Sequence, residues 1–230
     1  MKLDKRLIDF HSHILPCADH GSESLEMSLR QIERISAADV KTVVATPHFY
    51  PDRTNVDKFL ETRRESEYNL REATGSNSPE IVVGAEVLIC SGIHKMKGLE
   101  KLCIGDTDYI LLEMPFYRWG DHLFETVRGI IQLGFKPIMA HIDRYCPKDV
   151  ERIMYLNVAA QVNTDAINSF FGRKKVMRWI DSGRVVALGS DIHGDGNYAD
   201  FVRGCTRLGD KCDEIMAMSE MILKNDKYVF

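Results

Sequence analysis

Several features that would assign this 230-residue chain to a class at once are missing. Thirty basic residues face 34 acidic ones, so the net charge is only −4 and offers no positive surplus for binding nucleic acid or an anionic membrane. No uncharged apolar run approaches the roughly 18 residues that a membrane span needs. The patterns G-x-G-x-x-G and G-x-x-x-x-G-K-[ST] are absent, so nothing supports a nucleotide site.

The six cysteines lack the C-x-x-C pairs and regular spacing of a disulfide framework or a structural zinc site. We expect most of them to be buried and reduced. The first residues, MKLDKRLIDFHSH, include basic side chains but no apolar stretch of about 7–15 residues follows, so we do not expect a signal peptide. The sequence therefore predicts a cytoplasmic protein without membrane insertion.

One cysteine has the C-x5-R spacing of cysteine-dependent phosphatases, formed by Cys146 and Arg152. The segment between them contains Asp149 and Glu151 and no glycine. Two carboxylates would repel a phosphate dianion, and Pro147 has no N–H to offer one. We therefore interpret this spacing as a coincidence.

Short apolar strands alternate with helical patterns along the chain, which is typical of βα units. Helical patterns cover residues 24–37 and 56–73, and a shorter helical segment is expected after the third strand. The predicted strands are 7–10, 42–45, 81–83, 109–112, 137–140, 159–162 and 185–188. We predict one α/β domain over residues 1–230, closed as a seven- or eight-stranded barrel, with a doubly wound open sheet as the competing topology.

Acidic or imidazole side chains follow every predicted strand, and six of the eight histidines lie at these points. In a parallel barrel, the C-terminal ends of all strands open on one face, where such barrels place their active sites. The residues at these ends are Asp9, His11, His13, His20, His48, Glu86, Glu113, His141, Arg144, Asn163, Asp165, Asp191 and His193. The other two histidines, His94 and His122, are expected at the surface.

This set of side chains predicts a metal centre. His11 and His13, two apart in an extended segment, point to one side and can bind one ion together. Glu86 and Glu113 would be costly to bury unless they were paired or bound to metal. Imidazole and carboxylate without thiolate suit Mn, Fe or Zn. We expect two or three ions, because one ion cannot use all nine candidate ligands, which are His11, His13, His20, His48, Glu86, Glu113, His141, Asp191 and His193.

The charge of such a centre indicates its substrate. Three divalent ions, less three carboxylates and a bridging hydroxide, leave a surplus of about +2, which a phosphomonoester dianion would match. Arg144, three residues after His141, is placed to hold a phosphate oxygen. The alternative for Arg144 is a surface salt bridge.

These residues resemble the PHP (polymerase and histidinol phosphatase) superfamily and, within it, the CpsB/YwqE-type tyrosine phosphatases of capsule and exopolysaccharide loci. The resemblance covers essentially the whole chain in six ordered motifs: DFHSHILP (9–16) with DHGS (19–22), ATPH (45–48), GAE (84–86), LEMP (112–115), AHIDRY (140–145) and GSDIH (189–193).

The resemblance implies a distorted, TIM-like (β/α)7 barrel with three divalent ions, usually manganese. It implies three ligand sets, which are His11, His13, Glu86 and Asp191 for the first ion, Glu86, Glu113 and His141 for the second, and His20, His48 and His193 for the third. Catalysis would then depend on Arg144, His141 and Asp191, with Arg144 binding phosphate. Asp9 and Asp165 would orient histidines or bound water.

Two positions depart from the family pattern. His20 stands where the family usually has aspartate, which lowers the negative charge of the site. The arginine that usually follows the last motif is missing, and the segment there is 194–198, GDGNY. Arg53, Arg118 and Arg173 lie in or near predicted mouth loops and are candidates to replace it.

The resulting hypothesis is hydrolysis of protein phosphotyrosine, with the tail of a bacterial tyrosine kinase as substrate. A metal-bridging hydroxide would attack phosphorus in line, and the phenolate, with a pKa near 10, would leave with little acid assistance. A small-molecule phosphatase, such as one acting on histidinol phosphate, is the first alternative. A degenerate protein that docks a kinase tail without cleaving it is the second.

Overall fold

The computed structural model describes residues 6–226, and every strand pairing in it is parallel. The strands are β1 Leu7–Ser12, β2 Val40–Ala45, β3 His48–Phe49, β4 Glu80–Val83, β5 Glu86–Leu88, β6 Tyr109–Glu113, β7 Lys136–Met139, β8 Ala159–Asn163 and β9 Val185–Gly189. They form one sheet in the order β1-β2-β4 and another in the order β3-β5-β6-β7-β8-β9.

The two sheets belong to one continuous β-structure, because two strands cross from the first sheet to the second after a short break. β2 continues into β3 after Thr46 and Pro47, and β4 continues into β5 after residues 84–85. Hydrogen bonds bridge both interruptions, since Gly84 N donates to Ala45 O at 2.9 Å and Glu86 N donates to Pro47 O at 3.1 Å. The nine short strands therefore correspond to the seven predicted ones, with β2 and β3 forming one and β4 and β5 forming another.

The ends of the chain of strands also meet. Asp191 N, just after β9, donates to His11 O in β1 at 2.8 Å. His13 N donates back to Ile192 O at 3.2 Å. These bonds join the last strand to the first, so the arrangement is a closed, irregular barrel. The prediction of a distorted seven-stranded barrel is confirmed, and the open doubly wound sheet is excluded.

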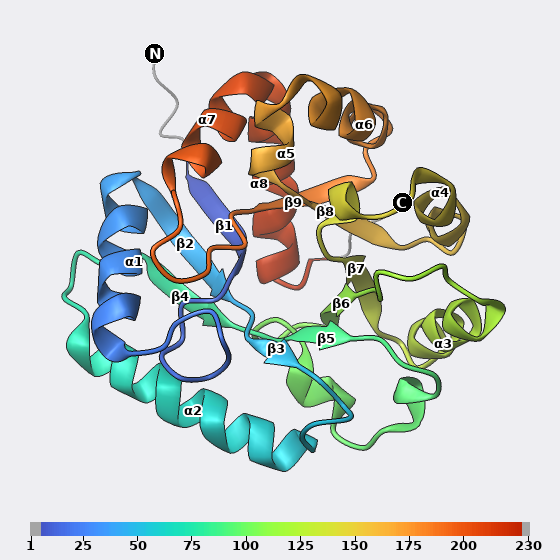
Figure 1. Cartoon of the computed structure of the whole chain (residues 1–230), viewed down its shortest axis with the longest axis horizontal. Coiled ribbons are helices and arrows are strands. Elements are labelled where there is room, and N and C mark those ends of the chain that lie inside the picture. Colours follow the sequence, from blue (N-terminus) through green and yellow to red (C-terminus); the bar gives the residue numbers. More distant parts are fainter. Residues whose placement is uncertain (1–5, 227–230) are drawn as a thin grey trace.

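Helices surround the strands (Figure 1). They are α1 Leu25–Ala37, α2 Val56–Ala73, α3 Asp121–Gln132, α4 Pro147–Met154, α5 Thr164–Asn168, α6 Phe170–Asp181, α7 Ala199–Leu208 and α8 Asp210–Leu223, with 3-10 turns η1 Ile93–Lys95, η2 Leu99–Leu102 and η3 Ile142–Arg144. The third strand is followed only by η1 and η2, where we had expected a short helix. Within residues 6–226, no helix has the length and apolarity needed to cross a bilayer.

Side-chain caps set the starts of the two longest predicted helical patterns. Ser24 Oγ accepts a hydrogen bond from Met27 N at 3.2 Å before α1. Asn55 Oδ1 accepts one from Lys58 N at 2.9 Å before α2. Each cap satisfies an N–H that the first helical turn leaves without a partner, so the helices begin where the sequence predicts.

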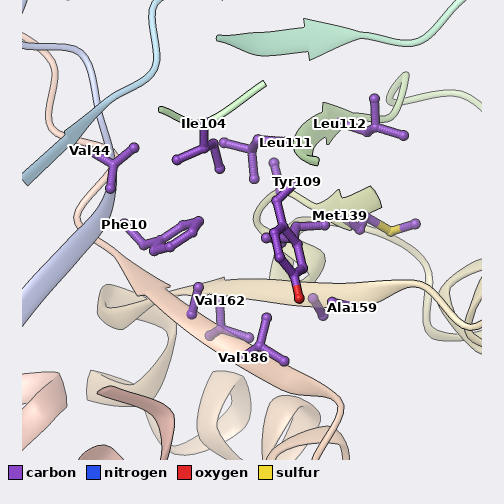
Figure 2. Packing of buried hydrophobic residues seen from close by; sticks show 14 of the residues in the cluster. Phe10, Val44, Ile104, Tyr109, Leu111, Leu112, Met139, Ala159, Val162 and Val186 are labelled. Carbon is purple, nitrogen blue, oxygen red and sulfur yellow. The ribbon is translucent and has the colours of Figure 1, made fainter. Parts of the chain in front are cut away.

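The strands bury an apolar core. Figure 2 shows side chains of strands far apart in the sequence packed together, among them Phe10, Leu111 and Val162. All three are fully buried. Toward their C-terminal ends these strands bury polar side chains instead, such as His11 after Phe10 and Asn163 after Val162. This change from apolar to polar burial places the site at one end of the barrel.

Candidate metal centre

Glu86 lies at the centre of the polar cluster. Its Oε2 is 3.3 Å from Nε2 of both His11 and His13, and 2.9 Å from Nδ1 of His48. Its Oε1 is 2.7 Å from Nε2 of His141. Burial opposes ionisation of Glu86, but the surrounding imidazoles hold the pKa of its carboxyl well below the usual range. One fully buried carboxylate is thus shared by four histidines.

Asp191 extends the cluster toward the mouth. Its Oδ1 is 3.3 Å from His13 Nε2 and 3.5 Å from His193 Nδ1. Its Oδ2 is 2.6 Å from Nη2 of Arg144, a side chain that is 43% exposed. Burial opposes ionisation here too, but His11, His13 and Arg144 lower the pKa of Asp191. Arg144 therefore lies at the site, bonded to a predicted ligand.

The backbone is strained at two of the predicted ligands. His141 has φ +31° and Asp191 has φ +51°, in the left-handed region that side chains other than glycine rarely adopt. Each follows a strand end, β7 or β9. Such conformations cluster at functional sites, where the surrounding structure holds them. The turns direct both side chains into the cluster.

The two other histidines of the cluster, His20 and His193, stack against the rings already described. The rings of His13 and His193 are 4.1 Å apart, and the ring of His20 is 4.9 Å from those of His48 and His193. His20 is exposed at the rim. Burial, together with His13, lowers the pKa of His193 to about 4. The pKa values of His11, His13 and His48 are shifted the other way, because neighbouring carboxylates outweigh the effect of burial on these imidazoles.

The donor set fits divalent metal ions. Three groups have ligand atoms all within 4.8 Å of one another, namely His11, His13 and Asp191, then His48, Glu86 and Glu113, then His13, His48 and His193. Glu86 Oε2 and Glu113 Oε2 are buried and accept no well-aligned hydrogen bond, although the Nδ1 atom of His48 lies 2.9 Å from the first and 3.6 Å from the second. An unsatisfied buried acceptor is costly, and a bound cation would satisfy both. Imidazole and carboxylate suit Mn, Fe or Zn.

Asp19 positions two of these histidines and was missed as a site residue. Its Oδ2 lies 2.7 Å from His13 Nδ1 and accepts a hydrogen bond from His48 N at 2.8 Å. The bond to Nδ1 leaves His13 Nε2 facing Glu86. The Asp19 side chain is only 5% exposed, and although burial opposes its ionisation, the bonds to His13 lower its pKa. Its place beside His20 in the first motif was the available signal.

Gln161 was also missed. Its Oε1 accepts a hydrogen bond from His141 N at 2.7 Å and lies 3.1 Å from His11 Nδ1. Its Nε2 donates to Asn163 Oδ1 at 2.9 Å, and Asn163 Nδ2 donates to Asp191 Oδ2 at 3.0 Å. A buried amide chain therefore links three predicted ligands. Gln161 lies within an apolar strand and belongs to no motif, so nothing in the sequence marked it as a site residue.

The two aspartates expected to orient histidines lie differently. Asp9 is buried and accepts hydrogen bonds from Ser190 N and Oγ at 2.8 and 2.6 Å and from the Tyr198 hydroxyl at 3.0 Å. It mainly holds the segment after β9, and burial raises its pKa to about 6. Asp165 is exposed in the first turn of α5 and contacts no site histidine within residues 6–226. Asn163, two residues earlier, is the residue that bonds a predicted ligand, because its Nδ2 donates to Asp191 Oδ2.

The candidate replacements for the missing arginine are spread around the mouth. Arg53 lies over the ring of Tyr50 at 4.7 Å, and Tyr50 stacks on His48 at 5.0 Å. Arg118 and Arg173 are exposed. None of the three makes an ion pair with a predicted ligand among the described residues, so the position of the family arginine has no evident substitute.

The C-x5-R spacing does not form a phosphate loop. Cys146 is exposed at the start of α4, and the following residues are helical. Arg152 donates to Asp121 Oδ1 at 3.0 Å and lies over the ring of Phe124. This agrees with the interpretation of the spacing as a coincidence.

Of the two histidines expected at the surface, only His122 is exposed, so the prediction is wrong for His94. His94 is half-buried against Gly129 of α3.

Known proteins are similar to this chain over most of its length. The family described as "Capsular polysaccharide synthesis, CpsB/CapC" matches residues 7–230. Tyrosine-protein phosphatase CpsB of Streptococcus pneumoniae is 25% identical over 209 residues, which are 81% of this chain and 83% of that one. Tyrosine-protein phosphatase YwqE of Bacillus subtilis (strain 168) is 24% identical over 200 residues, covering 81% and 77%.

Solved structures give the same fold. A chain from the crystal structures of YwqE from Bacillus subtilis and CpsB from Streptococcus pneumoniae, described as metal-dependent tyrosine phosphatases, matches with a TM-score of 0.81 at 19% identity, over 97% of this chain and 96% of that one. The TatD-like protein of Archaeoglobus fulgidus matches with a TM-score of 0.53 at 13% identity, over 88% and 92%.

Proposed function

The chain belongs to the CpsB/CapC family of capsular polysaccharide synthesis, and on that premise we propose that it is a metal-dependent phosphatase that hydrolyses phosphotyrosine in proteins. The observation that carries the proposal is Glu86, a fully buried carboxylate within 3.3 Å of four imidazoles at the barrel mouth. Such a cluster has little structural use without cations.

We propose three divalent ions, manganese first, with iron or zinc as the other candidates. The ligand sets are those that the resemblance implies: His11, His13, Glu86 and Asp191; Glu86, Glu113 and His141; His20, His48 and His193. Bound there, such ions would lower the pKa of a coordinated water and stabilise negative charge on phosphate oxygens. The unbonded oxygens of Glu86 and Glu113 support the first two sets.

Arg144 would bind the phosphate of the substrate. Its guanidinium has five N–H donors, and the ion pair with Asp191 leaves donors free for phosphate oxygens. The same ion pair holds the guanidinium beside the cluster, which reduces the rotamer freedom lost on binding. The Arg144 charge would favour the growing negative charge on the equatorial oxygens during in-line attack.

The leaving group suits tyrosine. A phenolate, with a pKa of about 10, leaves with little proton donation. An alkyl phosphate would have a much poorer leaving group.

The protein substrate we propose is the tyrosine-phosphorylated tail of a bacterial tyrosine kinase, in the cytoplasm. None of the six cysteines is in a disulfide, which suits a reducing compartment, although Cys17, Cys90 and Cys146 are exposed, so the prediction that most of them are buried is wrong. Residues 1–230 would act as one domain, since the predicted ligands come from both ends of the chain.

The test is phosphate release from a phosphotyrosine peptide with added manganese and with a chelator. We expect manganese-dependent turnover that the chelator removes. His141→Ala and Arg144→Ala should lower kcat/KM at least about a hundredfold. The matched controls, His122→Ala and Arg128→Ala, replace exposed residues and should retain wild-type rates.

Three results would contradict the proposal. They are turnover that survives the chelator, wild-type rates in both site variants, and faster turnover of histidinol phosphate than of the peptide. The last would favour a small-molecule phosphatase. Metal content near zero in the purified protein, with no turnover, would favour a docking protein.

A further inference from the structure

Phe116 is an exposed aromatic side chain beside the candidate metal centre. It lies in the loop between β6 and α3, and 69% of its surface is exposed. Its ring centroid is 6.4 Å from that of His141, with an interplanar angle of 12°, and 5.8 Å from that of Tyr145. Single exposed apolar residues are common, so its exposure alone means little. Its place against a predicted ligand is the notable feature.

The loop that carries Phe116 is anchored on both sides. Met114 is buried, and its N–H donates to the Tyr145 hydroxyl at 3.0 Å. Trp119 is buried too, and its Nε1 donates to Pro115 O at 2.9 Å. The exposed ring thus stands on a fixed base. A ring positioned in this way loses little conformational freedom when a ligand stacks on it.

A phosphate held by Arg144 would bring its ester group close to this ring. Arg144 belongs to η3, which directly follows His141, the histidine against which Phe116 stacks. In phosphotyrosine, one oxygen separates phosphorus from the aromatic ring. The substrate ring must therefore lie at the protein surface next to the bound phosphate, where Phe116 offers an open apolar face.

A second aromatic residue, Tyr50, also contacts a predicted ligand but has less free ring surface for a substrate. Tyr50 stacks on His48 at 5.0 Å, and Arg53 also lies over its ring, at 4.7 Å. Tyr50 is only partly accessible, whereas Phe116 is mostly exposed. Of these two rings, Phe116 has the surface to receive a ligand.

We propose that Phe116 binds the phenolic ring of phosphotyrosine and so selects aryl over alkyl phosphate monoesters. Aromatic pairs are stabilised in offset-stacked or edge-to-face arrangements, with centroids about 4.5–7 Å apart. Phe116 determines specificity and takes no part in proton transfer. The inference rests on the proposed function, because it needs a phosphotyrosine substrate.

The test measures binding of two phosphonates that are not hydrolysed, benzylphosphonate and ethylphosphonate, to the manganese-loaded protein by calorimetry. Phe116→Ala should weaken benzylphosphonate binding about tenfold and change ethylphosphonate binding less than about twofold. Phe116→Trp should retain the preference for the aryl ligand. Tyr117→Ala is the matched control, since Tyr117 is 63% exposed and makes no ring contact within residues 6–226.

Two results would overturn the inference. Equal loss of both phosphonates in Phe116→Ala would mean that the ring acts through His141 or the loop, and no loss of benzylphosphonate would mean that it binds nothing. A parallel assay of phosphotyrosine peptide turnover keeps the two proposals apart. If the wild-type protein hydrolyses the peptide and Phe116→Ala binds benzylphosphonate as tightly as wild type does, the ring contact is refuted and the phosphatase proposal stands. A selective loss of benzylphosphonate without any turnover supports the ring contact and refutes the phosphatase.

Discussion

The middle of the barrel strands and their C-terminal ends differ within a single residue step. In β6, Tyr109 to Leu112 are buried apolar or aromatic residues, and the next residue, Glu113, is a buried carboxylate with an oxygen that makes no hydrogen bond. Burying the first four stabilises the fold, whereas burying the fifth opposes it. Stability and function are thus divided along the length of each strand.

The same contrast applies to the backbone. β7 ends and His141 follows in the left-handed region, and Asp191 does the same after β9. Conformational strain and unsatisfied charge therefore lie together at the mouth, supported by the apolar region below. The comparison predicts that substitutions at the mouth change activity and metal binding, and that substitutions in the core change stability.

The largest expected effect is at Glu86. Glu86→Gln keeps the size of the side chain but removes the charge shared by four imidazoles, so we expect turnover to fall roughly a thousandfold or more. Metal content, measured by mass spectrometry of the purified protein, should fall with it. The exposed Glu100→Gln is the control. Full metal content and activity in Glu86→Gln would contradict the expectation that the residues at the mouth determine metal binding and turnover.

The core counterpart is Phe10, one residue from His11 and fully buried. Phe10→Ala should lower the free energy of unfolding by about 3–5 kcal/mol, because it removes apolar contacts and leaves a cavity. Denaturant unfolding measures this, with the exposed Phe171→Ala as control. The folded fraction should retain its metal content. A small stability change with large metal loss would reverse the comparison.

A smaller effect is expected where the two regions meet. Gln161→Leu removes the amide that links His11, His141 and Asn163. We expect the manganese concentration for half-maximal turnover to rise roughly 10- to 100-fold. The exposed Gln132→Leu should leave it unchanged. An unaltered manganese requirement in Gln161→Leu would show that the ligands are held without the amide.

The smallest effect concerns pH. Burial raises the pKa of Asp9 to about 6, above the value of about 3.9 in an unfolded chain. The folded protein then binds more protons between these values, so stability from Asp9 is present below about pH 4 and is lost as the pH rises through about 6. Asp9→Asn cannot titrate.

Unfolding of both proteins in chelator should test this. The advantage of wild type over Asp9→Asn should decrease between pH 4 and pH 7. An advantage that stays constant or increases over this range would contradict the assigned shift.

Local sequence patterns were sufficient to predict the seven strands and the positions of the histidines and acids at their ends. Apolar runs and helix caps act over a few residues, so they can be predicted locally, as for the helix that begins after Ser24. The grouping of His11, His13, Glu86 and Asp191 followed from the family resemblance. Parallel strands alone predicted only that these side chains share a face.

The orientation of Asp165, the closure of the barrel and the roles of Gln161 and Phe116 depend on the tertiary structure. Asp165 would share a face with Asn163 if the strand continued, but α5 begins at Thr164 and turns Asp165 to the outside. Closure of the barrel between His11 and Asp191, and the roles of Gln161 and Phe116, depend on contacts between residues far apart in the chain. Such contacts leave no local pattern, because they exist only once the strands have come together.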